Sequence, residues 1–195
     1  MAVKFTFDSD KTAAALLYLA TRLPKMDKYI ACKMLFLADK QHLVKYGRPI
    51  TGDSYSAMDH GPVPSNTLTL LNGLENGQDN SLARMFDLNH LYRYPRLIPK
   101  GEPDMQLLSR SNVQSLDEVA DAHGRKSFAE LKALTHELAA YKKAWERPRH
   151  GDSAPMDFED FFSEDEDAIA GAFEEMLEND ELRRAFPEPI EFQSR

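Results

Sequence analysis

The strongest constraint on the fold is a pair of apolar helical repeats on either side of Pro24. Leucine and alanine recur at helical spacing over residues 10–23, and Pro24 ends this stretch because its nitrogen has no hydrogen to donate within a helix. A second repeat with the same spacing covers residues 27–46. Gly47 follows it, at the position where helices often end in a left-handed residue. The sequence therefore predicts two helices that form an antiparallel hairpin.

The middle of the chain predicts a small β element. Residues 54–58 read as a short strand that follows a turn rich in glycine and proline. Residues 93–98 form a second strand candidate, in which Pro95 favours an edge position because it cannot donate to a neighbouring strand. We expect these two strands to pair with each other. We expect the residues 75–90, which are rich in Asn, Asp and Gly, to form a loop.

Further helices are predicted on both sides of this β element. They are a short helix with Ser65 as its N-cap and helices over residues 112–123, 127–135 and 136–146. The helix over 127–135 begins with a capping box, in which two side chains each accept a hydrogen bond from a free backbone N–H. The fold class that this pattern predicts is mainly α with a small β element (α+β).

The composition predicts three regions along the chain. We expect a compact helical domain over residues 1–146, a linker rich in proline, glycine and charge over 147–157, and an acidic C-terminal extension over 158–195. Residues 163–166 have the pattern of a capping box, and apolar residues follow them at helical spacing. The extension is therefore expected to contain one acidic amphipathic helix.

The formal net charge of −8 is unevenly distributed along the chain. Residues 1–151 contain 21 Lys and Arg and 17 Asp and Glu, a balance of +4. Residues 152–195 contain 3 Lys and Arg and 15 Asp and Glu, a balance of −12. Because this acidic extension would repel a phosphate backbone and the basic residues of the body form no cluster, we expect no direct binding of nucleic acid.

Motifs of common enzyme classes are missing from the sequence, which contains no phosphate-binding glycine loop, HExxH, GxSxG or paired CxxC. The nearest approach to a catalytic site is the pair Asp39 and His42 on one helix face, with Asp53 and His60 beyond it. A carboxylate beside an imidazole can serve acid–base catalysis or hold a divalent metal, so a metal-dependent hydrolase is one alternative function. The other interpretation is a charge pair that fixes the following turn. We expect no cofactor and no bound metal.

The sequence also bears on the location of the protein. It has no run of about 18 apolar residues that would span a bilayer. The N-terminus is charged and lacks the apolar core of a signal peptide. We therefore expect a cytoplasmic protein without membrane contact, in which the single cysteine, Cys32, is a buried apolar residue.

One dense stretch of sequence resembles a known family. Residues 33–43 (KMLFLADKQHL), 46–57 (YGRPITGDSYSA) and 61–65 (GPVPS) are similar, in this order, to the helix, turn and strand pattern of the Panacea domain. This domain is also called SocA-like or phage-associated GepA-like. The resemblance extends over about residues 12–146 and leaves the acidic extension outside.

The resemblance implies a mostly helical domain with a small β element, and it implies a function. A member of this family would be the antitoxin of a bacterial or prophage toxin–antitoxin system, which neutralises a cognate toxin by direct protein–protein binding. Neutralisation would proceed either by masking the toxin or by delivering it to a protease. The family implies no catalytic residue. A phage accessory regulator that acts through another protein is a further alternative.

Two parts of the chain are candidates for contact with a partner. In the matched turn, Arg48 and Asp53 are expected to form an ion pair that either locks the turn or meets the partner. The helix of the acidic extension is too short to be stable alone in water, so we expect it to pack on a basic toxin or on the basic body of the same chain. Disorder of the extension is the third alternative. The candidate partner contacts are Arg48, Asp53, Tyr55, Asp160, Phe161, Phe162, Phe173 and Met176.

Overall fold

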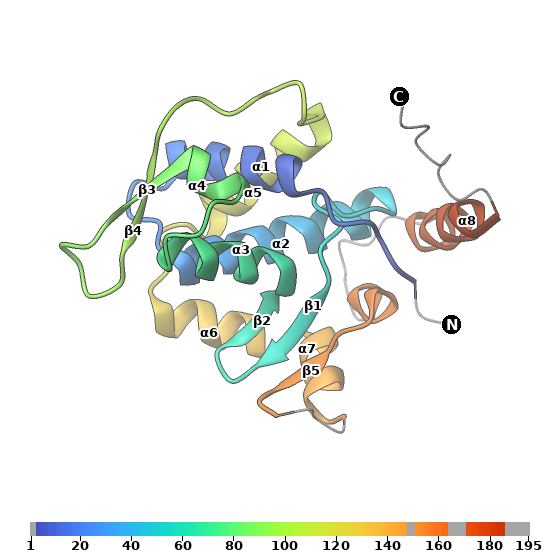
Figure 1. Cartoon of the computed structure of the whole chain (residues 1–195). Coiled ribbons are helices and arrows are strands. Elements are labelled where there is room, and N and C mark those ends of the chain that lie inside the picture. Colours follow the sequence, from blue (N-terminus) through green and yellow to red (C-terminus); the bar gives the residue numbers. More distant parts are fainter. Residues whose placement is uncertain (1–2, 148–150, 164–170, 186–195) are drawn as a thin grey trace.

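Helix α2 (Lys28–Tyr46) lies at the centre of the fold, and other elements surround it (Figure 1). The computed structural model of the protein describes residues 3–147, 151–163 and 171–185. Twelve residues of α2 are buried, and they face all sides of the helix. A helix of this kind must be covered all round. Helices α1 (Ser9–Arg22), α5 (Arg110–His123) and α8 (Ala172–Ala185) are among the elements that cover it.

Helices α1 and α2 form the predicted hairpin. Each follows an aspartate, Asp8 or Asp27, whose carboxylate accepts the backbone N–H three residues further on at 2.9 Å. Gly47 ends α2 in the left-handed region, with a φ of 64°. The helices expected over residues 10–23 and 27–46 are confirmed to within one residue at each end.

The remaining helices agree with most of the sequence predictions. They are α3 (Ser65–Glu75), α4 (Ser81–Met85), α6 (Phe128–His136), α7 (Ala139–Trp145) and the 3-10 helix η1 (Phe158–Phe162). The loop expected over 75–90 is wrong, because Asn80 accepts hydrogen bonds from the backbone N–H of Leu82 and Ala83 and begins α4. Residues typical of loops also cap helices, and here they do so. Among the helices of the described ranges, none is both long and apolar enough to cross a membrane.

Two small antiparallel sheets accompany the helices. The first has the order β2-β1-β5 and consists of β1 (Tyr55–Met58), β2 (Gly61–Pro64) and β5 (Ser153–Pro155), and the second consists of β3 (Phe86–Asn89) and β4 (Arg96–Pro99). The expected pairing of the strands at 54–58 and 93–98 is wrong. The strand at 54–58 pairs instead with β2 and β5, and the strand at 93–98 pairs with β3. The pairings with β2 and β3 join strands that are close in sequence, which requires less loop-closure entropy.

The C-terminal extension packs on the body in its described part. Strand β5 adds to the free edge of β1, although it lies in the range 147–157 that was expected to be a linker. Phe161 of η1 is buried against Phe36 of α2, with 5.7 Å between the ring centroids. The mainly α fold with a small β element is confirmed, whereas the division of the chain into domains remains a prediction.

Candidate partner-binding site

Residues 47–53, called the motif turn below, lead from α2 towards β1, and the buried carboxylate of Asp39 holds their backbone. Asp39 Oδ1 accepts the backbone N–H of Ile50 at 2.8 Å and that of Thr51 at 3.1 Å. Asp39 Oδ2 accepts the hydroxyl groups of Thr51 and Tyr55. Burial raises the pKa of Asp39 to about 6, and these hydrogen bonds act in the opposite direction. Both carboxylate oxygens are therefore occupied in fixing the turn.

The imidazole of His42 ties the same turn to α5. Its Nδ1 donates to the backbone carbonyl of Arg48 at 2.6 Å, and its Nε2 lies 3.0 Å from both Ser111 Oγ and Asn112 Nδ2. Burial lowers the pKa of His42 to about 4, so the ring is neutral at pH 7. The ring is fully buried. His42 is thus a structural link between three segments of the chain.

Asp53 acts as a cap for helix α3. Its Oδ1 accepts the backbone N–H of Asn66 at 2.9 Å and the Asn66 side-chain amide at 3.0 Å. Its Oδ2 accepts the backbone N–H and the hydroxyl of Thr67 at 2.8 Å and 2.7 Å. The expected ion pair of Asp53 with Arg48 is wrong, since no ion pair joins them in the described structure. The expected cap Ser65 is also wrong, because the N-cap position is Pro64 and Asp53 supplies the missing acceptors.

Lys33 holds the β1–β2 hairpin on the other side of α2. Its ammonium donates to the Pro62 carbonyl at 2.7 Å and lies 5.1 Å from the centre of the Tyr29 ring. Burial lowers the pKa of Lys33 to about 8. A Cβ atom on Gly61 would lie 2.6 Å from Thr135 Oγ1, so only glycine fits beside this contact. The residues of the matched motif are used here to join secondary structure elements.

The four residues proposed for a metal-dependent hydrolase do not come together. Asp39, His42 and Asp53 are buried with separate partners, as described above. His60 is exposed at the tip of the β1–β2 hairpin, where it lies 3.3 Å from Asp59 and packs on Phe128. In residues 3–147, 151–163 and 171–185, no group of three His, Cys, Asp or Glu side chains could hold a metal ion. The geometry therefore does not favour metal-dependent hydrolysis.

A groove of about 610 Å³ runs along the outer side of the motif turn. Its lining comes from the N-terminal segment, α1, the motif turn and α8. The lining residues are Phe5, Thr6, Asp8, Lys11, Arg48, Pro49, Ile50, Thr51, Gly52, Asn179 and Leu182. The groove thus joins the matched motif to the acidic extension, and the Leu182 side chain is 57% exposed beside it.

Two cations, Arg48 and Lys11, and one carboxylate, that of Asp8, line this groove, a balance of +1. Arg48 is exposed, and its guanidinium forms no ion pair with a described residue. Lys11 is half-buried, and burial lowers its pKa, while the neighbouring Asp8 and Asp39 raise it and Arg48 lowers it. The arrangement suits an acidic side chain of a partner better than a basic one. Neither Lys11 nor Leu182 was a candidate from the sequence, because their closeness to Arg48 arises only from packing.

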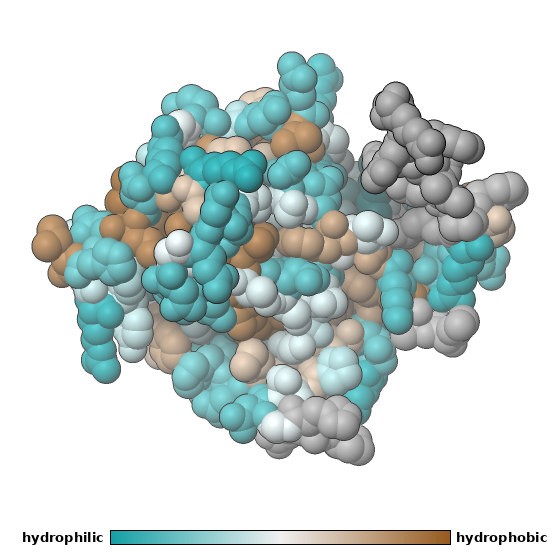
Figure 2. All heavy atoms as spheres, in the orientation of Figure 1, coloured by the Kyte–Doolittle hydropathy of each residue, from teal (hydrophilic) through white to brown (hydrophobic). Residues whose placement is uncertain are grey.

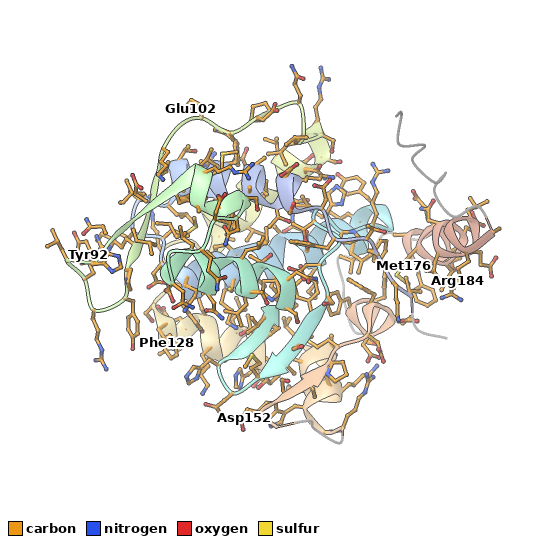
Figure 3. The ribbon with its side chains drawn as sticks, in the orientation of Figure 1. Tyr92, Glu102, Phe128, Asp152, Met176 and Arg184 are labelled. Atoms are coloured by element: carbon orange, nitrogen blue, oxygen red, sulfur yellow. The ribbon has the colours of Figure 1, made fainter. Side chains whose placement is uncertain are left out.

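The other candidate contacts are placed against the body of the chain. Phe161 and Met176 are buried, and Met176 lies on the side of α8 that faces the body (Figure 3). Phe162 and Phe173 pack on each other, with 5.1 Å between the ring centroids. Asp160 accepts from Arg147 at 2.6 Å. The extension was expected to pack either on the body of the same chain or on the toxin. Its described part packs on the body, while its contact with a partner remains a prediction. The helix start expected at 163–166 lies largely outside the described residues.

The comparisons with known proteins identify a family. A family model described as antitoxin SocA-like, Panacea domain, matches residues 32–146, which is more than half of the 195 residues. A comparison with curated proteins and one with solved structures found no match. The matched range includes α2, the motif turn and Asp53, and it ends before the acidic extension.

Proposed function

The chain belongs to the SocA-like antitoxin family with a Panacea domain, and we propose that it is the antitoxin of a bacterial or prophage toxin–antitoxin system. It acts in the cytoplasm, where it neutralises a cognate toxin by direct protein–protein binding. The observation that carries this proposal is the family match over residues 32–146. Binding masks the toxin, and delivery of the bound toxin to a protease is the second route by which it is removed.

The use of the buried polar residues supports a role without catalysis. Asp39, His42 and Asp53 each have their hydrogen-bonding atoms engaged with backbone or side chains of the same chain. Groups that catalyse proton transfer must be able to reach a substrate, and these three are completely covered. They are better suited to hold a rigid surface for binding, since rigid loops lose little entropy when a partner binds.

The groove beside the motif turn is the proposed contact surface for the toxin. We propose that Arg48 meets the toxin directly, together with Lys11 and Leu182 of the same groove. Asp53 and Tyr55 contribute by holding the turn that presents Arg48. Asp160, Phe161, Phe162, Phe173 and Met176 contribute by holding the extension, and hence α8, beside this groove.

Co-expression tests the proposed function. The reading frame adjacent to the gene is expressed alone and together with this chain, and growth is followed. We expect the adjacent product to arrest growth alone, and the chain to restore growth and co-purify with it. If a growth arrest persists while both proteins are present in the soluble fraction, the antitoxin role is refuted. The amount of toxin separates the routes, because masking leaves it unchanged and delivery to a protease lowers it.

A charge reversal tests the groove. Arg48→Glu should weaken binding of the adjacent product by about tenfold, since it removes a cation that faces the partner. Arg125→Glu is the matched control, because Arg125 is exposed and forms no ion pair with a described residue. Equal binding by both variants, with rescue intact, would move the contact surface away from the groove while leaving the antitoxin role unchanged.

A further inference from the structure

The β3–β4 hairpin exposes apolar side chains at the end of the molecule opposite α8 (Figure 1). The hairpin tip, defined here as residues 89–96, includes Leu91, Tyr92 and Tyr94, which are 91%, 44% and 63% exposed. Leu91 is the most exposed large apolar side chain in the described part of the chain. Apolar side chains gather at this end in the space-filling view (Figure 2), and Tyr92 marks it among the side chains (Figure 3). Grouped exposure of this kind is typical of an interaction site.

The base of the hairpin is firmly anchored to the body. Phe86 and Leu97 are buried, and the Leu97 backbone N–H donates to the Met26 carbonyl at 2.9 Å. At the tip, Asn89 Oδ1 accepts the backbone N–H of Leu91 at 3.0 Å and closes the turn. The exposed side chains are therefore presented by an ordered frame, which lowers the entropy that binding costs.

Two guanidinium groups make the tip basic. The Arg96 guanidinium lies 3.3 Å from the centre of the Tyr92 ring, and that of Arg93 lies 5.5 Å from the centre of the Tyr94 ring. Neither arginine forms an ion pair with another residue that the structure describes, whereas Lys100 at the base pairs with Asp87 at 2.9 Å. The tip is thus a positively charged apolar surface on a chain whose net charge is −8.

We propose that the hairpin tip docks on an acidic surface of the toxin that has an apolar pocket for Leu91 and Tyr94. This inference rests on the proposed antitoxin function and adds a second contact surface to it. Tyrosine and arginine are enriched among the residues that dominate the affinity of protein interfaces. The uncompensated charge of Arg93 and Arg96 calls for carboxylates on the partner, and such complementarity speeds association.

A protein partner fits the tip better than a nucleic acid does. Two guanidiniums are few beside the roughly 6–10 phosphate contacts that a strongly salt-dependent DNA-binding protein makes. Leu91 is the most exposed large apolar residue of the tip, and its side chain has no hydrogen-bond donor for a phosphate group. Burial of Leu91 and Tyr94 in a protein pocket would instead remove apolar area from water, which favours association.

Binding measurements on tip variants test this inference. The immobilised probe is the product of the adjacent reading frame, and the analyte is the full chain. Leu91→Ser/Tyr94→Ser should weaken binding by about thirtyfold, which is the effect of losing a central interface residue. Met105→Ser is the matched control, because Met105 is 46% exposed and lies outside the hairpin. Circular dichroism and the melting temperature show whether each variant is folded.

A charge variant supplies a second, independent measurement. Arg93→Glu should weaken binding by about tenfold at about 50 mM salt, and by much less at about 500 mM, because salt screens charges at an interface rim. Arg125→Glu, the exposed control outside the hairpin, should bind as the wild type does at both salt concentrations.

The outcomes separate this inference from the antitoxin proposal. If the wild type binds and rescues growth, and the tip variants bind equally well, the inference is wrong and the antitoxin role stands. If the wild type neither binds nor rescues, both fall. Self-association of the chain that is lost in the tip variants, or binding of a labelled oligonucleotide that depends on Arg93, would also overturn the inference, in favour of a second copy or a nucleic acid.

Discussion

The imidazole Nε2 of His42 accepts a hydrogen bond from the side-chain amide of Asn112 at 3.0 Å, and this bond joins α2 to α5. The orientation of the Asn112 amide is fixed, because its oxygen accepts the backbone N–H of Ser109 at 3.1 Å at the start of α5. On the other side of the ring, Nδ1 must donate, since its partner is the Arg48 carbonyl. Only the neutral ring with its proton on Nδ1 satisfies both contacts, and protonation would place two donors face to face.

We expect the stabilising contribution of His42 to be complete above about pH 6.5 and to be lost as the pH falls towards about 4. The unfolded chain takes up a proton on His42 near its usual pKa of about 6.5, whereas burial keeps the pKa of the folded residue at about 4. The wild type should therefore lose its advantage over His42→Gln as the pH falls. The difference between their free energies of unfolding should be smaller at pH 4 than at pH 8 by about 2–3 kcal/mol.

The comparison with the variant is needed because Asp39 titrates in the same range with the opposite sign. Burial raises the pKa of Asp39 to about 6, so the folded chain takes up this proton before the unfolded chain does. The pH dependence of the wild type alone would mix both groups. A difference between wild type and His42→Gln that stays constant from pH 4 to 8 would contradict the assignment of a neutral buried ring.

Asp53→Ala should lower the free energy of unfolding by about 2–4 kcal/mol, because it leaves several donors at the start of α3 without an acceptor. The donors are the backbone N–H groups of Asn66 and Thr67 and the Thr67 hydroxyl. Asp152→Ala is the control, since Asp152 is exposed. Urea denaturation measures both variants, and equal stability would show that Asp53 does not cap the helix.

Gly47→Ala should be more destabilising than Gly77→Ala. Both glycines have a positive φ, of 64° and 70°, so alanine is strained at each position by about 1–2 kcal/mol. Only at Gly47 would the new Cβ also meet α8, at 2.8 Å from the Ala172 carbonyl oxygen and 3.0 Å from the Met176 nitrogen. A Cβ added at Gly77 would have no atom within 4 Å apart from those of its chain neighbours.

The consequence of Gly47→Ala should be local to the extension. We expect limited proteolysis to cleave Gly47→Ala faster near α8 than it cleaves the wild type or Gly77→Ala, because the clash moves α8 away from the motif turn. Equal cleavage of the two variants would indicate that the close contact between Gly47 and α8 is absent in solution.

Phe161→Ala should cost about 3–5 kcal/mol of stability, the usual effect of removing a fully buried phenylalanine. Its ring packs on Phe36 and Tyr55, with centroid distances of 5.7 Å to each. The adjacent Phe162 is only partly buried, so Phe162→Ala should cost about 1–2 kcal/mol. Thermal and urea unfolding compare the two variants. If Phe161→Ala were as stable as Phe162→Ala, the extension would not pack on the body through Phe161.

Local sequence patterns were sufficient for most of the helical fold. The apolar repeats around Pro24 and the glycine after residue 46 predicted the bounds of α1 and α2, since the end of a helix depends on residues within about one turn of it. The short strand at 54–58 was also predicted, but its neighbours β2 and β5 were not. Strand pairing joins segments whose separation along the chain is not encoded in their periodicity.

The partners of the polar residues were decided only by the tertiary structure. Asp53 was expected to pair with Arg48, yet it caps a helix that begins twelve residues after it. Lys11 and Leu182, which line the groove beside Arg48, come from opposite ends of the chain. The sequence determined most of the helices, the family and the acidic character of the extension, because these depend on residue types and local spacing. Packing determined which side chains meet, because a buried carboxylate or imidazole binds the donors that the folded chain brings to it.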